Sequence, residues 1–273
     1  MIGEKMTPFW YAFVLTAFAG LSTGIGSLIA FLSKKTNPGF LSLSLGFSAG
    51  VMIYISLVEF LSQAKNALSL QMGLYKSQWV TVLAFFTGIA VIWLIDSLIP
   101  SSENPHEPKT IEEMISPVTN RSLQRIGLLT AVSISIHNFP EGLATFTSAL
   151  QKPTLGISIA VAVALHNFPE GIAVSVPIWF STGSKRKAFL WSFLSGLTEL
   201  IGALLGYLFL RTFMNGPMEG ILLAFVAGIM VFISLDELLP TAEKFGKHHL
   251  AISGVITGMA IMALTMLVLN PSL

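Results

Sequence analysis

A motif of polar and helix-breaking residues occurs twice in this chain. The first copy is His137-Asn138-Phe139-Pro140-Glu141-Gly142, and an identical copy spans residues 166–171. His and Glu are four residues apart in each copy, so on a helix they share one face. Imidazole nitrogen combined with carboxylate oxygen suits zinc, iron and other first-row divalent metals. The motifs therefore predict a metal site built from His137, Glu141, His166 and Glu170.

The asparagines of the two motifs extend this site. Asn138 and Asn167 lie three residues before Glu141 and Glu170. Each Glu can therefore face a His on one side and an Asn on the other. This geometry permits two adjacent metal positions that share both glutamates. Amide oxygens give the second position a harder character than the first.

Proline and glycine are the other part of each motif. Pro140 and Pro169 each remove a backbone hydrogen bond, so we expect a kink, and Gly142 and Gly171 are expected to loosen the next turn. Non-helical backbone at membrane depth is tolerated only where it is buried or lines a water-filled cavity. The alternative is a purely structural kink held by polar contacts. Two copies with His and Glu at identical offsets favour the metal site.

The composition indicates a membrane protein. Of the 273 residues, 53% are hydrophobic and 11% are charged, and the mean hydropathy is +0.76. Soluble domains carry about 25% charged residues. The absence of cysteine excludes disulfides and thiolate metal sites. The first apolar run is too long for a signal peptide and lacks a small-residue cleavage pattern, so we expect it to be a span.

Eight apolar runs have about the 20-residue length that crosses a bilayer. They are 9–32, 40–62, 79–100, 126–150, 155–179, 188–210, 221–239 and 250–269. The sequence thus predicts an all-α membrane protein with a single polytopic domain over residues 1–273. Residues 101–125 are expected to form a polar cytoplasmic loop between the third and fourth spans.

Acidic residues inside the predicted spans are the strongest functional signal. All 15 Lys and Arg lie in loops or at span ends, whereas seven acids do not: Glu59, Asp96, Glu141, Glu170, Glu199, Asp236 and Glu237. A charge at the bilayer centre costs about 2.5–3.5 kcal/mol. Three of them, Glu141, Glu170 and Glu199, fall near the midpoints of their spans, so they are either protonated or neutralised by a cation. Glu199 is a candidate fifth ligand, with a protonated glutamate bonded to a neighbouring helix as the alternative.

Other candidates lie along the same spans. Met52 and Glu59 are seven apart and share a helix face. Met52 is a candidate ligand, although methionine is more often core filler, and Glu59 lies near the outer end of its span, where it could receive ions. Asp96, Asp236 and Glu237 lie near inner ends, where they could serve release or simply sit at the interface. His106, His248 and His249 are weaker metal candidates in predicted inner loops.

A second repeat relates the second and seventh spans. Residues 49–61 and 227–239 share Ala-Gly-x-Met and Ile-Ser-Leu-x-Glu-x-Leu in one register. The two spans cross in opposite directions, as do the fourth and fifth. Inverted repeats are a common transporter design, with the site at the repeat interface. Chance similarity of apolar helices is the alternative, and the shared register disfavours it.

The distribution of Lys and Arg predicts the orientation. Ten of the 15 fall on one side of the predicted spans and five on the other. Because positive residues concentrate inside, both termini are expected outside the cell membrane.

At these motifs the chain resembles the ZIP (zinc/iron-regulated-transporter-like) family, and most closely its bacterial ZupT-like branch. The resemblance implies eight helices, with spans 1–3 related to 6–8 by inversion around spans 4 and 5. It implies a binuclear centre, with one metal held by His137, Glu141, His166 and Glu170 near Met52, and the other by Asn138, Glu141, Asn167, Glu170 and Glu199. Glu59 matches the family's entrance position, and Asp236 and Glu237 match its exit.

The resulting expectation is a divalent metal uptake transporter that is not an enzyme and has no cofactor. Zinc is the first candidate substrate, followed by iron, manganese, cobalt and cadmium. A passive metal channel is the main alternative. An intramembrane metalloenzyme is disfavoured because His-Glu-x-x-His is absent. Metal ions and the lipid bilayer are the expected partners; nucleic acid is not, and a homodimer is compatible with the apolar surface.

Overall fold

The computed structural model describes residues 8–32, 38–97, 120–210, 217–246 and 248–269. These ranges are helical apart from short turns and contain no strand. The α-helices are α1 (Pro8–Leu32), α2 (Pro38–Tyr54), α3 (Leu61–Met72), α4 (Leu74–Ser97), α6 (Asn120–Gln151), α7 (Pro153–Thr182), α8 (Lys185–Leu210), α9 (Pro217–Ile233), α10 (Leu239–Phe245) and α11 (His248–Leu269). The predicted loop at 101–125 lies outside the described residues up to position 119, and α6 begins within its last part.

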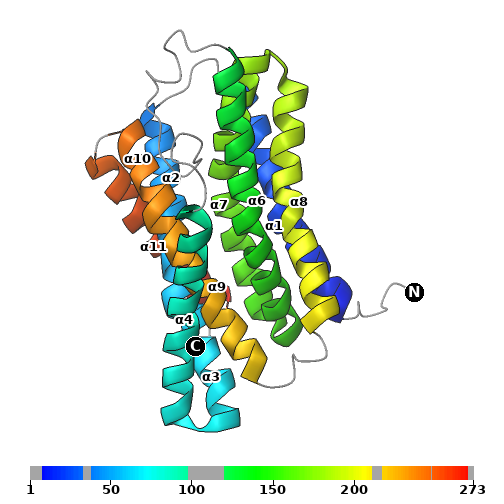
Figure 1. The fold of residues 1–273 in the computed structure, drawn as a ribbon, viewed down its shortest axis with the longest axis vertical. Coiled ribbons are helices and arrows are strands. Elements are labelled where there is room, and N and C mark those ends of the chain that lie inside the picture. Colours follow the sequence, from blue (N-terminus) through cyan, green and yellow to red (C-terminus); the bar gives the residue numbers. More distant parts are fainter. Residues whose placement is uncertain (1–7, 33–37, 98–119, 211–216, 247, 270–273) are drawn as a thin grey trace.

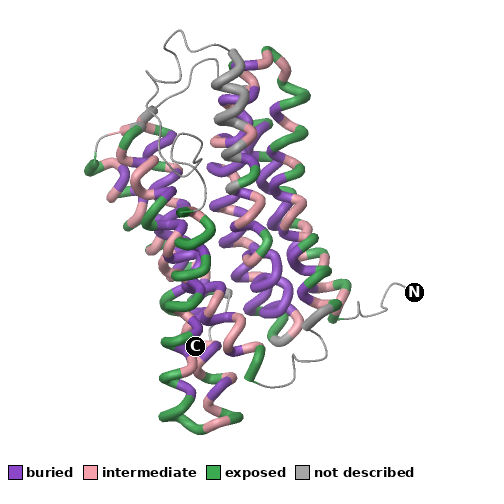
Figure 2. The backbone as a smooth tube through the Cα atoms, viewed as in Figure 1, coloured by how far each residue is buried: buried purple, intermediate pink, exposed green. Residues whose placement is uncertain are grey.

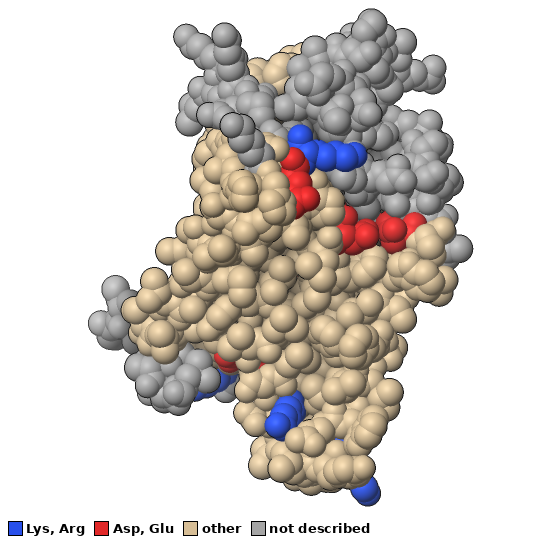
Figure 3. Space-filling view, turned by 90° about the vertical axis from the view of Figure 1, so that its left-hand side faces the viewer, with Lys and Arg blue, Asp and Glu red and all other residues tan. Residues whose placement is uncertain are grey.

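Most of these helices have the dimensions of membrane spans. Within the described ranges, seven stretches are long and apolar enough to cross a bilayer: Pro8–Phe31, Gly39–Met72, Leu74–Ser97, Pro153–Thr182, Lys185–Leu208, Pro217–Lys244 and His248–Val268. Helix α6, at 32 residues, is long enough to be the remaining span, predicted at 126–150, but it contains more polar residues. On the face drawn in Figure 3, the charged side chains gather toward the two ends. The prediction of an all-α membrane protein is confirmed.

The helices form two groups, visible side by side in Figure 1. Helices α1, α6, α7 and α8 pack against one another, and we call them the motif bundle. Helices α2, α3, α4, α9, α10 and α11 form the second bundle. Across the boundary, α7 contacts α2 and α11, and α6 contacts α9. The buried residues concentrate where helices face each other (Figure 2).

Glycines bring the backbones into direct contact inside each bundle. A Cβ on Gly88 of α4 would overlap the carbonyl oxygen of Phe225 in α9, and a Cβ on Gly228 of α9 would overlap that of Phe85 in α4. Small residues at such crossings let membrane helices approach closely. These close contacts between α4 and α9 therefore depend on glycine having no side chain.

Within the described helices two segments are π-helical, and both lie in the second predicted repeat. They are Ile55–Phe60, between α2 and α3, and Ser234–Leu238, between α9 and α10. Each contains the Glu of its Ile-Ser-Leu-x-Glu sequence, and both Glu59 and Glu237 are buried. Short π segments in helices are frequent at functional sites. The common geometry supports the predicted repeat, and its inversion stays a prediction.

The motif prolines lie inside helices. The α-helix is continuous through Pro140 in α6 and through Pro169 in α7, and the expected kinks stay predictions. Gly142 and Gly171 admit neighbouring backbone, because a Cβ there would overlap the carbonyl oxygens of Glu199 and Thr23 respectively. The motif glycines therefore allow close packing of the motif bundle.

We predict that Gly88→Ala destabilises the protein. The added methyl group meets the backbone oxygen of Phe225, which cannot rotate away. Overpacking of this kind costs about 1–3 kcal/mol of unfolding free energy, measurable by denaturant titration in detergent. Gly24→Ala is the matched control, since its Cβ would lie 3.3 Å from a ring atom of Phe193, a side chain that can shift. Equal losses for the two variants would contradict the backbone-contact interpretation.

Candidate metal centre

The predicted ligands come together in the interior of the motif bundle. Helices α6 and α7 follow one another through a very short connection and pack along their length, which brings the two motifs side by side. Helix α8 packs against both of them. None of the seven polar residues is more than 2% exposed: His137, Asn138, Glu141, His166, Asn167, Glu170 and Glu199. The centre is therefore shielded from both lipid and solvent.

Histidine and glutamate pair across the two helices. His137 Nε2 lies 3.1 Å from Glu170 Oε1, and His166 Nε2 lies 3.1 Å from Glu141 Oε2. The four-residue spacing had indicated that His and Glu of one helix share a face, and the structure adds that each His contacts the Glu of the other helix. The two pairs are reciprocal. They bring two imidazoles and two carboxylates into one contiguous cluster.

The asparagines tie this cluster to α8 and α1. Asn138 Nδ2 donates to the carbonyl oxygen of Ser195 in α8 over 3.1 Å. Asn167 Nδ2 donates to the carbonyl oxygen of Ala19 in α1 over 2.9 Å and also to Glu199 Oε1. Both amide nitrogens thus position the asparagine side chains on backbone carbonyls. The two amide oxygens have no hydrogen-bond partner among the described residues.

Every one of the seven residues retains one buried donor or acceptor atom without a hydrogen-bond partner among the described residues. These atoms are His137 Nδ1, Asn138 Oδ1, Glu141 Oε1, His166 Nδ1, Asn167 Oδ1, Glu170 Oε2 and Glu199 Oε2. Buried polar groups are normally paired, and an unpaired one costs about 1–3 kcal/mol. All seven are oxygen or nitrogen atoms of the kinds that bind divalent metals. The donor set therefore fits a metal ion as cargo.

The described part of the chain contains no group of three or more His, Asp or Glu side chains arranged to hold a metal ion. In this arrangement one nitrogen of each motif histidine is engaged by a carboxylate of the other helix. Metal binding through these atoms requires the two His-Glu pairs to open. The ligand assignment itself stays a prediction.

The predicted entrance and exit residues lie in the second bundle. Glu59 is 3% exposed and accepts a 2.9 Å hydrogen bond from Gln63 Nε2 one turn later. Glu237 is buried and Asp236 exposed, both in the second π segment. Asp96 is partly buried at the last turn of α4. Neither group is part of the His-Glu cluster, and both roles stay predictions.

Met52 and three histidines are the remaining candidates. Met52 is fully buried in an apolar cluster to which α2, α7 and α9 contribute, and its role as a ligand stays a prediction. His248 is exposed and pairs with Glu243 Oε1 at 2.6 Å, and His249 contacts the ring of His248. His106 lies outside the described residues.

Comparison with known proteins identifies the family. The family model described as ZIP zinc transporter matches residues 100–266, more than half of the chain and both motifs. The chain belongs to the ZIP zinc transporter family. A zinc transporter ZupT of Streptococcus mutans is 62% identical over 256 residues, covering 94% of this chain and 96% of the relative. A zinc transporter ZupT of Clostridium perfringens is 56% identical over 279 residues, covering 97% and 98%.

Membership of the ZIP family confirms three predictions made from sequence. The resemblance to ZupT-like proteins holds over nearly the full chain. ZIP proteins are transporters, so the expectation that this chain is not an enzyme is confirmed. The long apolar helices make it a multi-pass membrane protein.

Sequence reasoning missed the contribution of α1. The carbonyl oxygen of Ala19 holds Asn167 just as that of Ser195 holds Asn138. A signal was present, because Gly20-Leu21-Ser22 in α1 resembles Gly196-Leu197-Thr198 in α8, and each is followed by Ile-Gly three residues later. This similarity is short and apolar, and it gains meaning only once both segments are seen against the motifs.

We predict that His137→Ala destabilises the protein by about 3 kcal/mol, because it leaves the buried Glu170 carboxylate without its partner. Chemical unfolding in detergent with a metal chelator measures the loss. Adding Glu170→Gln to His137→Ala removes the unpaired charge and should restore part of the stability. His248→Ala is the control, and since its pair with Glu243 is exposed we expect less than about 1 kcal/mol. A similar loss for both histidines would contradict the importance of the buried pair.

Proposed function

We propose that this ZIP family member takes up zinc across the cell membrane through the centre between α6 and α7. The observation that carries the proposal is the buried cluster of His-Glu pairs in which every side chain keeps a free donor atom. Oxygen and nitrogen ligands of this mixture suit zinc and other first-row divalent ions. The relatives named zinc transporter support zinc as the main substrate. We propose iron, manganese, cobalt and cadmium as further substrates of the transporter.

The centre is proposed to hold two metal ions. The first position uses His137, Glu141, His166 and Glu170, with Met52 on its α2 side. The second uses Asn138, Glu141, Asn167, Glu170 and Glu199. The contact between Asn167 and Glu199 supports the second set, because it brings the α8 carboxylate to the α7 amide. Shared glutamates couple the two positions electrostatically.

The path is proposed to run from Glu59 on the outer side to Asp236, Glu237 and Asp96 on the inner side. This direction follows from the Lys and Arg distribution, with both termini outside a bacterial inner membrane. The whole chain then acts as one polytopic domain with a cytoplasmic loop at 101–125. A homodimer through lipid-facing helices stays part of the proposal.

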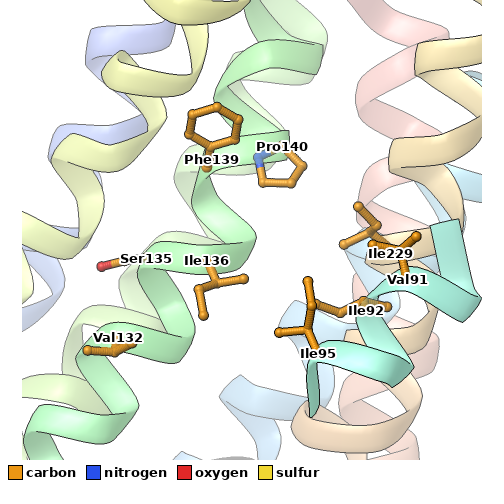
Figure 4. Close-up of a pocket in the computed structure, with 9 residues that line it drawn as sticks. All are labelled: Val91, Ile92, Ile95, Val132, Ser135, Ile136, Phe139, Pro140 and Ile229. Atoms are coloured by element: carbon orange, nitrogen blue, oxygen red, sulfur yellow. The ribbon is translucent and has the colours of Figure 1, made fainter. Parts of the chain in front are cut away.

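Transport is proposed to move the motif bundle against the second bundle. The seven candidate ligands other than Met52 all lie on α6, α7 and α8, within the motif bundle. Glycine-backbone contacts lock α1, α6, α7 and α8 together. Between α6 and the helices α4 and α9, by contrast, lies a cavity of about 480 Å³ (Figure 4). Its lining is apolar except for Ser135. Apolar side chains form no directional bonds, so this boundary can slide.

Zinc uptake into proteoliposomes tests the central site. Wild type is expected to show saturable uptake, and Glu141→Ala with Glu170→Ala to abolish it, because both shared ligands are lost. Glu243→Ala removes an acid outside the centre and should leave uptake unchanged. Equal uptake by wild type and the double variant would refute transport through this centre. Uptake without saturation would instead favour a passive channel.

Cross-linking tests the relative movement of the bundles. The chain has no cysteine, so Ile95→Cys in α4 and Val132→Cys in α6 introduce the only thiols, on opposite walls of the cavity. A membrane-permeant bifunctional thiol reagent is expected to lower zinc uptake at least tenfold in the double variant. The two single-cysteine variants with the same reagent are the controls. Full uptake by the cross-linked double variant would contradict the movement.

A further inference from the structure

The equivalence of α1 and α8 assigns a counterpart to Glu199. In α1 the sequence from Gly20 to Gly26 is Gly-Leu-Ser-Thr-Gly-Ile-Gly, and in α8 the sequence from Gly196 to Gly202 is Gly-Leu-Thr-Glu-Leu-Ile-Gly. Five of the seven positions are identical or exchange serine for threonine. In this register Thr23 takes the place of Glu199.

The contacts of the two segments agree with the register. A Cβ on Gly142 of α6 would overlap the carbonyl oxygen of Glu199, and a Cβ on Gly171 of α7 would overlap that of Thr23. Helices α1 and α8 also meet reciprocally, since a Cβ on Gly196 would lie 2.9 Å from Thr23 Cβ and one on Gly20 would lie 3.3 Å from Glu199 Cβ. Thr23 therefore stands beside the second motif as Glu199 stands beside the first.

Backbone carbonyls preceding the two residues complete the correspondence. Ala19, four residues before Thr23, accepts the amide of Asn167. Ser195, four residues before Glu199, accepts the amide of Asn138. Asn167 is thus held by α1, which carries Thr23, and Asn138 is held by α8, which carries Glu199.

Thr23 keeps a free hydroxyl in the interior. It is 0% exposed, and its Oγ1 has no hydrogen-bond partner within the described ranges. Hydroxyls in helices ordinarily bond to a carbonyl of their own preceding turn. Thr16 Oγ1 on the same helix does so, to Ala12 over 3.0 Å, as does Ser27 to Gly24 over 2.6 Å. An unpaired buried hydroxyl is costly. Other described residues, such as Ser42 and Thr81, also keep unpaired hydroxyls, and Thr23 differs from these two in that its own carbonyl packs against Gly171 of the second motif.

We propose that Thr23 Oγ1 is a further oxygen donor of the central site, where it binds a water molecule in the hydration shell of the transported ion. Thr23 Oγ1 faces α8, 2.9 Å from where a Cβ on Gly196 would lie. The neighbouring residue Ser195 holds Asn138 through its carbonyl oxygen, and Asn138 Oδ1 is likewise without a partner among the described residues. Threonine is too short to replace a glutamate as a direct ligand at the same backbone position. A bridging water spans such a gap with little loss of interaction energy.

The exchange of Glu for Thr gives the centre one charged and one neutral side. A hydroxyl can hold a hydrated cation without adding negative charge, so the ion is bound more weakly there than beside Glu199. Ions that suit oxygen and water ligands, such as Mn²⁺, depend more on this contact than Zn²⁺, which takes imidazole readily. Thr23 then sets part of the metal preference. This inference rests on the proposed transport through the central site.

Uptake kinetics of Thr23→Val test the role, because valine keeps the shape and removes the hydroxyl. We expect the KM for Mn²⁺ to rise about fivefold to tenfold, the KM for Zn²⁺ to rise less, and the maximal rate to stay within about twofold, since one ground-state hydrogen bond is lost. Thr23→Ser keeps the hydroxyl and should retain the wild-type KM values. Thr16→Val, which removes a buried hydroxyl already bonded to its own helix, is the matched control.

The result that overturns the proposal is a Thr23→Val profile equal to that of Thr16→Val, or a lower maximal rate with unchanged KM values, which indicates a packing role. Raised KM values in Thr23→Ser would overturn it too, because the hydroxyl is still present. Failure of the proposed function looks different. It appears as uptake that persists in the Glu141→Ala, Glu170→Ala variant, whatever Thr23 variants do.

Discussion

The structure depends on placing carboxylates in a membrane interior where no Lys or Arg of the described helices pairs with them. Glu141 and Glu170 are buried in the middle of α6 and α7, and each contacts a histidine of the other helix. In a medium of low dielectric constant such acids need a proton, a partner or a cation. The imidazoles provide a partner that a divalent metal can displace, because both compete for the same carboxylate oxygens.

The packing around the centre follows from this need for close, dry contact. Gly142 and Gly171 directly after the glutamates admit the backbones of α8 and α1. The carbonyl groups of those helices then fix the motif asparagines. Position and shielding of the ligands thus come from the same glycines. The four helices that meet there form a unit with little freedom of internal movement.

The boundary between the bundles is built on the opposite principle. Apolar side chains and a cavity lie along it. Among the described helices of the second bundle, α9 is the main neighbour of α6. The motif bundle has a polar interior, and its boundary with the second bundle is apolar and adaptable. The central site can therefore change its exposure while its ligands stay together. The paired π segments at Ile55–Phe60 and Ser234–Leu238 place buried acids in the second bundle.

Composition, periodicity and the doubled motif determined the fold class, the membrane setting and six of the seven polar side chains of the centre. These features are local, because four-residue spacing and apolar run length are properties of one helix. Glu199 was a candidate from its burial in a span without a basic partner. Only the tertiary structure decided that the histidines pair across helices, that the helices stay continuous through Pro140 and Pro169, and that α1 lies against the second motif. Those outcomes depend on which helices touch, and backbone contacts at glycines leave almost no trace in hydropathy.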